Sequence, residues 1–250
     1  MTITTGDSAP TFILDHVAVG VHDLAACAPL LEDLLGAEPD SGGPSPNFTF
    51  AQWKFSGDAR LELIAPRGEP GFLHRFLTKQ GPGIHHVTFK VPDLERAAAW
   101  ARTQGYEVVG YDDRFPSWKE CFLHPKQAQG IVVQFAESHP ELEPPSEWPV
   151  PRLSSARPQT PVPAARLHAV RLSARSQADA DRQWKTLLGA ESTVDALGTL
   201  YRWPKSPLAI HVCVDPNTTP GPIGLELVTP RPVVLPENAL ANFGTRFVCD

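Results

Sequence analysis

Four side chains that could bind a metal ion occupy equivalent positions in two similar segments of the sequence. His16 and His86 lie 70 positions apart, and Glu62 and Gln134 lie 72 positions apart. Nitrogen and oxygen ligands without a thiolate suit Mn²⁺, Fe²⁺, Co²⁺, Ni²⁺ or Zn²⁺. With neutral imidazoles, a single carboxylate leaves a net charge of about +1 on a bound dication. Such a site stabilises an enolate-like oxygen, and its remaining positions are open to water or a bidentate substrate.

Each of these segments, residues 12–66 and 83–137, predicts a β-α-β-β-β unit. A strand around His16 or His86 is followed by an N-capping aspartate, Asp23 or Asp93, and an amphipathic helix over 24–35 or 94–103. Strands over 48–55 and 118–124 precede the strands that carry Glu62 and Gln134. If a pseudo-twofold relates the units, their equivalent strands meet at the centre of a curved sheet, with the four side chains together.

The rest of the chain divides into a linker, residues 138–164, and a third, weaker repeat, residues 165–250. The linker contains eight prolines between Ser138 and Ala164, a density that excludes a helix or a central strand. In the third unit, Leu225–Val228 resembles Leu61–Ile64, and Ala169 takes the position of His16. We therefore expect no metal there. Its unpaired sheet edges favour a homodimer through residues 165–250, with packing on the first module or over its pocket as alternatives.

Composition limits the function classes. The chain has 250 residues, 42% of them hydrophobic, and a net charge of −6, without a block of basic residues. This disfavours nucleic acid and anionic membranes as partners and favours a small-molecule substrate. No apolar run approaches a membrane span, no secretory signal is visible at the start, and the four cysteines are scattered. We expect a cytoplasmic protein.

A general base near the metal would complete the chemistry, and Glu120 is our candidate for a catalytic residue. It lies on the strand expected to pair with the strand of Gln134. An inward-facing carboxylate there could remove a proton next to a carbonyl group. Trp53 and Trp118 are candidate walls of the substrate pocket, and Lys119 is a candidate partner for an anionic substrate.

Four blocks of sequence carry a resemblance to a known family: residues 14–19, 57–66, 83–89, and 122–126 with 130–134. On these residues, the segment from Phe12 to Glu137 resembles the vicinal-oxygen-chelate (glyoxalase/bleomycin resistance/dioxygenase) superfamily, and within it the methylmalonyl-CoA epimerases. The resemblance implies an α+β fold in which paired β-α-β-β-β modules form a glyoxalase-like curved-sheet metal cup. The implied ligands are His16, Glu62, His86 and Gln134.

The sequence departs from the epimerases at two points. They carry Gln and then Glu on the two last strands, whereas this chain has Glu62 and then Gln134, which leaves the charge of the site unchanged. They also resemble one another in an acid–base glutamate on the third strand, and counting back from Glu62 puts that position at or near Ala51. Ala51 cannot transfer a proton, so Glu120 becomes the candidate base.

The resulting hypothesis is a divalent-metal-dependent isomerase or lyase that acts through a metal-stabilised enolate of a small oxo or acyl substrate. An extradiol-type dioxygenase is one alternative, although the carboxylate expected in that class would stand at the position of Gln134. A non-catalytic, resistance-type binding protein is the other, although such proteins generally lack this ligand set.

Overall fold

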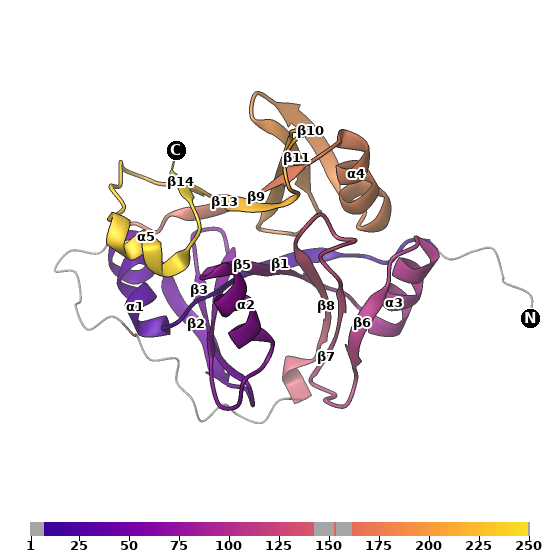
Figure 1. Cartoon of the computed structure of the whole chain (residues 1–250), viewed down its shortest axis with the longest axis horizontal. Coiled ribbons are helices and arrows are strands. Elements are labelled where there is room, and N and C mark those ends of the chain that lie inside the picture. The colour runs from indigo at the N-terminus through magenta and orange to yellow at the C-terminus, as the bar shows by residue number, and fades with distance from the viewer. Residues whose placement is uncertain (1–7, 143–152, 154–161, 250) are drawn as a thin grey trace, which may run out of the picture.

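The structure is a computed structural model that describes residues 8–142, 153 and 162–249. These residues form two curved β-sheets stacked on one another, one from each half of the chain (Figure 1). Most of the predicted linker lies outside the described residues. No helix among the described residues is long and apolar enough to cross a membrane.

The N-terminal module, residues 12–138, contains the larger sheet. Its strands are β1 (Ile13–Gly20), β2 (Glu38–Pro44), β3 (Phe48–Lys54), β4 (Arg60–Pro66), β5 (Gly83–Lys90), β6 (Val108–Asp112), β7 (Trp118–Leu123) and β8 (Val132–Ser138). They lie in the order β2-β3-β4-β1-β5-β8-β7-β6. Strands β1 and β5 are antiparallel at the centre, and each has the last strand of its own unit, β4 or β8, as a parallel neighbour. The sheet is therefore the predicted pair of β-α-β-β-β units.

The helices of this module follow from caps and apolar spacing. Helix α1 (Leu24–Pro29) continues into a π-helical turn, η1 (Leu30–Leu34), and α3 spans Leu94–Thr103. Asp23 and Asp93 accept hydrogen bonds from first-turn amides, as predicted for N-caps. Helix α2 (Phe72–Gln80), which the sequence analysis did not predict, packs on Ile64 through Leu73 and Leu77. A short 3₁₀ turn, η2 (Pro140–Leu142), follows β8.

The C-terminal module, residues 162–249, contains the second sheet. Its elements are β9 (Arg166–Ala174), α4 (Gln177–Asp181), η3 (Arg182–Leu187, π-helical), β10 (Glu191–Asp195), β11 (Gly198–Arg202), β12 (Ala209–Val214), β13 (Gly221–Val228), α5 (Glu237–Phe243) and β14 (Phe247–Cys249). The strand order is β10-β11-β12-β9-β13-β14. Because β12 is parallel to β9 as β4 is to β1, β9 to β12 form the β-α-β-β-β unit.

The predicted equivalence of Leu225–Val228 with Leu61–Ile64 is wrong. These residues lie on β13, which is antiparallel to β9 as β5 is to β1, so β13 follows the third unit instead of closing it. Glu226 pairs with Ala169, just as Thr88 pairs with His16. The alternation of Leu-Glu-Leu is shared by parallel and antiparallel strands, so it could not distinguish the two pairings.

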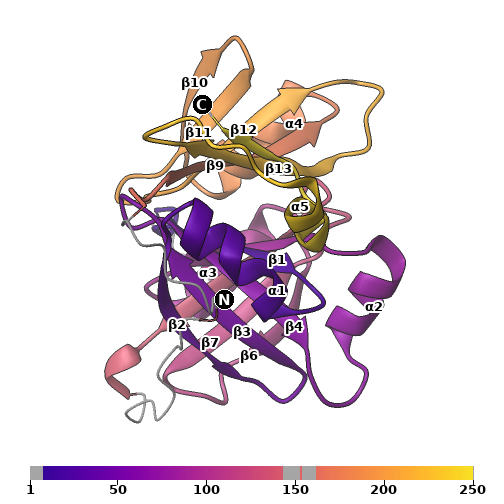
Figure 2. The ribbon, with the colours of Figure 1, turned by 90° about the vertical axis from the view of Figure 1, so that its left-hand side faces the viewer.

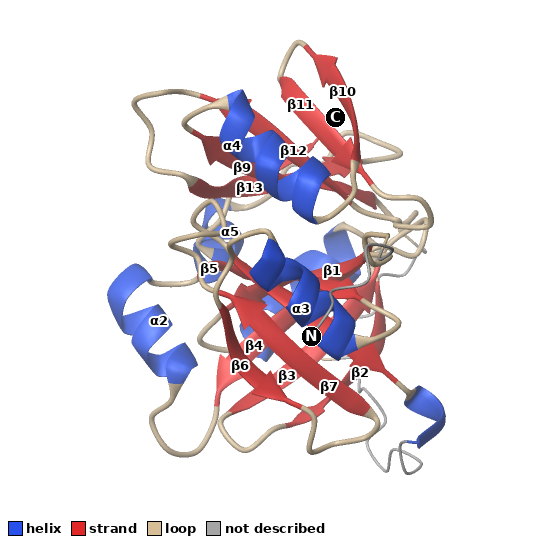
Figure 3. Cartoon of the chain, turned by 90° about the vertical axis from the view of Figure 1, so that its right-hand side faces the viewer, coloured by secondary structure: helices blue, strands red, loops and turns tan. Residues whose placement is uncertain are grey.

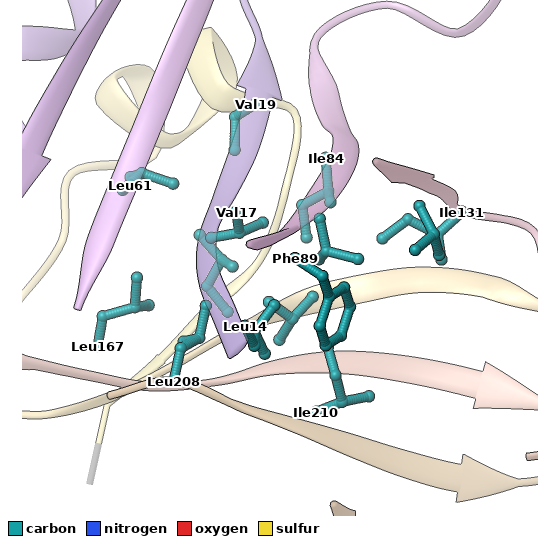
Figure 4. Packing of buried hydrophobic residues seen from close by; sticks show 14 of the residues in the cluster. Leu14, Val17, Val19, Leu61, Ile84, Phe89, Ile131, Leu167, Leu208 and Ile210 are labelled. Atoms are coloured by element: carbon teal, nitrogen blue, oxygen red, sulfur yellow. The ribbon is translucent and has the colours of Figure 1, made fainter. Parts of the chain in front are cut away.

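The two modules share one hydrophobic core. Phe89 of β5 packs edge-to-face against Trp203, with ring centroids 4.9 Å apart, and also lies against Trp184 of η3. The Leu14 amide donates to the Ser206 hydroxyl across the junction at 2.8 Å. Figure 4 shows Phe89 and Leu14 beside side chains of the C-terminal module.

The C-terminal module lies behind the central strands β1 and β5. Phe89, which contacts it, points away from the face that carries its neighbour Thr88, because adjacent side chains alternate along a strand. Figures 2 and 3 show the same stacking from two sides, with α1 and α3 on the lower, N-terminal module and α4 on the upper, C-terminal one. The module packs on the first module, and the alternative that it covers the pocket is wrong.

Candidate metal centre

The four predicted ligands come from the four central strands of the N-terminal sheet. His16 lies on β1, Glu62 on β4, His86 on β5 and Gln134 on β8. All four are buried, with exposed fractions between 1% and 8%. Four polar side chains this deep in a protein need partners, because an unpartnered buried polar group is costly.

Three of these residues converge on one point. His16, Glu62 and His86 each offer a ligand atom, and these atoms lie within 4.8 Å of one another. The Nε2 atoms of His16 and His86 lie 3.7 and 3.9 Å from the two oxygens of the Glu62 carboxylate. Those separations exceed a hydrogen bond and match the spacing of atoms that surround a common ion.

Both imidazoles are held at their other nitrogen by the residue that precedes them in sequence. Asp15 Oδ2 lies 2.8 Å from His16 Nδ1, and His85 Nδ1 lies 2.9 Å from His86 Nδ1. Asp15 and His85 are themselves repeat-equivalent, 70 positions apart. Holding Nδ1 leaves Nε2 directed at the cluster, which is how metal-binding histidines are commonly oriented.

Gln134 joins this cluster through Thr88. The Thr88 hydroxyl lies 3.0 Å from His16 Nε2 and 2.5 Å from Gln134 Oε1. Gln134 Nε2 donates to Glu120 at 2.7 Å, which fixes the carboxamide with its oxygen turned toward Thr88 and His16. With the His16 proton on Nδ1, toward Asp15, Nε2 is an acceptor; Thr88 then has one proton for two acceptors, and the site contains more acceptors than donors. A bound cation would satisfy the acceptors that lack a hydrogen-bond donor.

Electrostatics point the same way. Burial raises the pKa of the Glu62 carboxyl, although His16 and a hydrogen bond from Gln52 Nε2 at 2.9 Å oppose the shift. Burial, together with the charges of His85 and His16, lowers the pKa of His86 well below its usual range. Burial also lowers the pKa of His85 to about 4. Neutral imidazole is the form that binds a metal.

Glu120 faces this cluster, on the same side of the sheet. Its Oε2 accepts hydrogen bonds from Gln134 Nε2 and from the Trp118 indole, the latter at 2.9 Å. Its charge contributes to the raised pKa of Glu62. Trp118 also lies on this side, next to Glu120.

Two predicted substrate contacts are wrong. Trp53 is fully buried on the opposite face of β3, where its indole donates to Glu32 of η1 at 3.1 Å. Lys119 points away from the cluster, because it alternates with Glu120 along β7, and it forms an ion pair with Glu137 at 2.6 Å. Neither residue reaches the ligand cluster.

On β3 the residue beside the cluster is Gln52, not Ala51. In the antiparallel pairing of β3 and β4, Gln52 lies opposite Glu62 and Ala51 lies opposite Leu63. Gln52 is held by Ser41, whose hydroxyl donates to its carbonyl oxygen at 3.1 Å. Gln52 and Thr88 were not among the predicted site residues. Side chains alternate between the two faces along each strand, so Gln52 and Thr88 share a face with the ligands of the neighbouring strands. This pattern could have identified both residues.

Comparisons with known proteins place these observations in a family. Residues 15–122 match the profile of the Glyoxalase/Bleomycin resistance protein/Dioxygenase superfamily. The chain is 30% identical over 129 residues to the ethylmalonyl-CoA/methylmalonyl-CoA epimerase of Cereibacter sphaeroides, a match that covers 50% of this chain and 96% of that protein. It is 26% identical to the human mitochondrial methylmalonyl-CoA epimerase, over 50% of this chain and 73% of that protein.

A solved structure is also similar. The methylmalonyl-CoA epimerase from Mycobacterium tuberculosis aligns with 56% of this chain and 96% of its own, at 28% identity and a TM-score of 0.49. With half of this chain aligned to nearly the full length of a 30%-identical relative, the chain belongs to the glyoxalase/bleomycin resistance/dioxygenase superfamily through its N-terminal module.

Proposed function

We propose that the protein is a divalent-metal-dependent isomerase of the epimerase type, acting on an acyl thioester with an acidic C–H bond next to the carbonyl. The observation that carries this proposal is a continuous row of side chains on one face of the sheet. Glu120 contacts Gln134, Gln134 contacts Thr88, and Thr88 contacts His16. A candidate base thus lies beside a ligand set of two imidazoles, a carboxylate and a carboxamide. The named relatives support the thioester class.

His16, Glu62, His86 and Gln134 would hold the ion, which supplies Lewis-acid stabilisation of negative charge on a substrate oxygen. Glu120 Oε would take the proton from the carbon next to the carbonyl and return it to that carbon, and inversion would follow when the carbon has turned its opposite face to Glu120 before the proton returns. The Trp118 indole and the Gln134 amide, both donors to Glu120 Oε2, would hold the carboxylate in position. Gln52 keeps Glu62 oriented through its hydrogen bond.

Proton exchange tests this proposal more directly than product analysis. Methylmalonyl-CoA would be incubated in D₂O with Co²⁺-loaded protein, and loss of the C2 hydrogen followed by NMR. We expect exchange with the wild type, and none above background after the metal is removed with EDTA. The variant Glu107→Gln changes an exposed carboxylate of the same module and serves as the control. Failure of the metal-loaded wild type to exchange this hydrogen contradicts the proposal.

A further inference from the structure

The C-terminal sheet has a side-chain cluster of a different chemistry at the position that corresponds to the metal centre. Pairing across the strands makes His211 equivalent to Glu62 and Gly224 equivalent to His86. Arg171 stands at the position of Ala18. The cluster therefore contains a positively charged side chain, Arg171, whereas the metal centre of the N-terminal sheet consists mainly of hydrogen-bond acceptors.

Two arginines of this sheet face one hollow. A cavity of about 600 Å³ is lined by Arg171 of β9, Ile223 of β13, and Arg246 and Val248 beside and on β14. Arg171 pairs with Gly224, and the Arg246 carbonyl accepts from the Leu225 amide next to it at 2.8 Å. The two arginines thus lie two strands apart, about 10 Å between backbones, within reach of a single ligand.

Gly224 lets the backbone of Arg246 approach β13 closely. A Cβ atom there would lie 2.8 Å from the Arg246 carbonyl oxygen and 3.4 Å from the Arg246 Cβ. In the N-terminal sheet the same position is filled by the imidazole of His86. The absence of a side chain at Gly224 therefore brings Arg246 next to β13, at the position where the N-terminal sheet carries a ligand.

The guanidinium of Arg171 is incompletely paired. Its Nε is buried and has no hydrogen-bond partner among the described residues, and Glu226 Oε1 lies 3.5 Å away. That carboxylate is turned instead to His211, whose Nδ1 lies 2.9 and 3.1 Å from its two oxygens. The remaining contact of Arg171 is from Nη2 to the Cys213 sulfur at 3.5 Å.

Arg246 is exposed, and within the part of the chain that the structure describes its side chain forms no ion pair. Asp195, the other carboxylate near Arg171, also lies against His211, at 3.2 Å. Two arginine head groups with free donors therefore border a hollow whose other walls are the apolar side chains of Ile223 and Val248. A planar guanidinium binds the oxygens of a carboxylate or phosphate in a bidentate manner.

We infer that this hollow is a binding site for a small organic anion, with one carboxylate or phosphate head held by Arg171 and Arg246 and a short apolar body against Ile223 and Val248. It lies on the C-terminal module, apart from the ligand cluster of β1, β4, β5 and β8. Its occupancy does not depend on the proposed isomerase activity.

Isothermal titration calorimetry on the full chain tests this site, with protein that has been stripped of metal by a chelator and then dialysed free of it, so that no anion can bind through a metal. The probes are isobutyrate, isobutyl phosphate and inorganic phosphate, and the first two distinguish the head groups. We expect one-to-one saturable binding of at least one organic probe, weakened about tenfold or more in Arg246→Met, and weaker binding of inorganic phosphate. Arg202→Met, a change of an exposed arginine on β11 of the same sheet, should leave binding unchanged.

Because Arg246 is exposed, its replacement leaves the fold intact, and Arg171→Met serves as a second variant whose folding is checked by circular dichroism. Lack of saturable binding by both organic probes up to about 10 mM overturns the inference. Equal binding by wild type and Arg246→Met overturns it as well. Inorganic phosphate that binds as tightly as isobutyl phosphate overturns the role of Ile223 and Val248.

Discussion

The two sheets of this protein use the same strand arrangement to hold opposite kinds of polar cluster. In the N-terminal sheet, Glu62 lies 3.7 and 3.9 Å from two imidazoles, and among the described side chains no arginine or lysine contacts it. In the C-terminal sheet, Glu226 contacts His211 at 2.9 Å and lies 3.5 Å from Arg171. The first cluster contains no arginine or lysine among the described side chains, and the second contains Arg171.

This difference shows that topology fixes where polar side chains meet, and that residue type decides what they can bind. Trp53 and Tyr201, at equivalent positions on β3 and β11, illustrate what the two sheets have in common. Each directs its polar end to a carboxylate of the helical segment behind the sheet, Glu32 or Asp181. The scaffold is thus repeated, while the centre of each sheet has its own chemistry.

The largest expected effect concerns the proposed base. Glu120→Gln keeps an oxygen that can accept from Trp118 and Gln134 but cannot remove a proton. We expect the exchange rate of the substrate C2 hydrogen to fall by about 100-fold or more, since general-base catalysis contributes at least that much. Bound metal, measured in the same samples, should be unchanged. An unchanged rate would assign the proton transfer to another residue.

The second prediction compares the two buried carboxylates in metal-free protein. Glu226→Gln breaks a charged contact with His211 and should lower the free energy of unfolding by about 2–3 kcal/mol. Glu62→Gln replaces a buried carboxyl group that no described arginine or lysine contacts, and should raise the stability of the metal-free protein by about 1 kcal/mol.

Urea unfolding in EDTA measures both variants. Added Co²⁺ should stabilise the wild type and leave Glu62→Gln unaffected, because a bound metal stabilises only the state that binds it. Equal losses of stability in the two variants would remove the contrast between the sheets.

A smaller effect is expected from pH. The hydrogen bond to Glu226, with further help from the charges of Glu226 and Asp195, raises the pKa of His211 above 6.5. The stabilisation by protonated His211 is therefore complete below pH 6.5, the ordinary value, and is lost as the pH rises through the higher folded-state pKa. As the pH rises above 6.5, the wild type should lose more stability than Glu226→Gln. The His211 ring resonances should titrate above pH 6.5 in the wild type and lower in the variant.

Much of the N-terminal module could be predicted because its repeats mark their own boundaries. Asp23 and Asp93 mark the N-termini of the helices, and the alternation of apolar residues predicts the central strands. Strand β2 could not be located by propensity, since it contains two prolines and two glycines and lies at the sheet edge, where such residues are tolerated. Helix α2 was missed because it lies outside the repeated pattern.

The site was predictable at the level of residue types but not of contacts. Repeat equivalence selected His16, Glu62, His86 and Gln134, and the structure brings them to one face. The errors at Trp53 and Lys119 concern the face of a strand, which a shift of one residue reverses. The role of Thr88, which joins β1 to β8 across β5, depends on which strands are neighbours, and this emerged only from the strand order.

The metal content of purified, tag-free protein tests the central claim most directly. Plasma mass spectrometry would compare the wild type with His86→Ala, and with His168→Ala as a control that changes a histidine of the C-terminal sheet. We expect about one equivalent of Mn, Fe, Co, Ni or Zn in the wild type and in the control, and none in His86→Ala. Absence of metal from the wild type, even after reconstitution, would contradict a metal centre at His16, Glu62, His86 and Gln134.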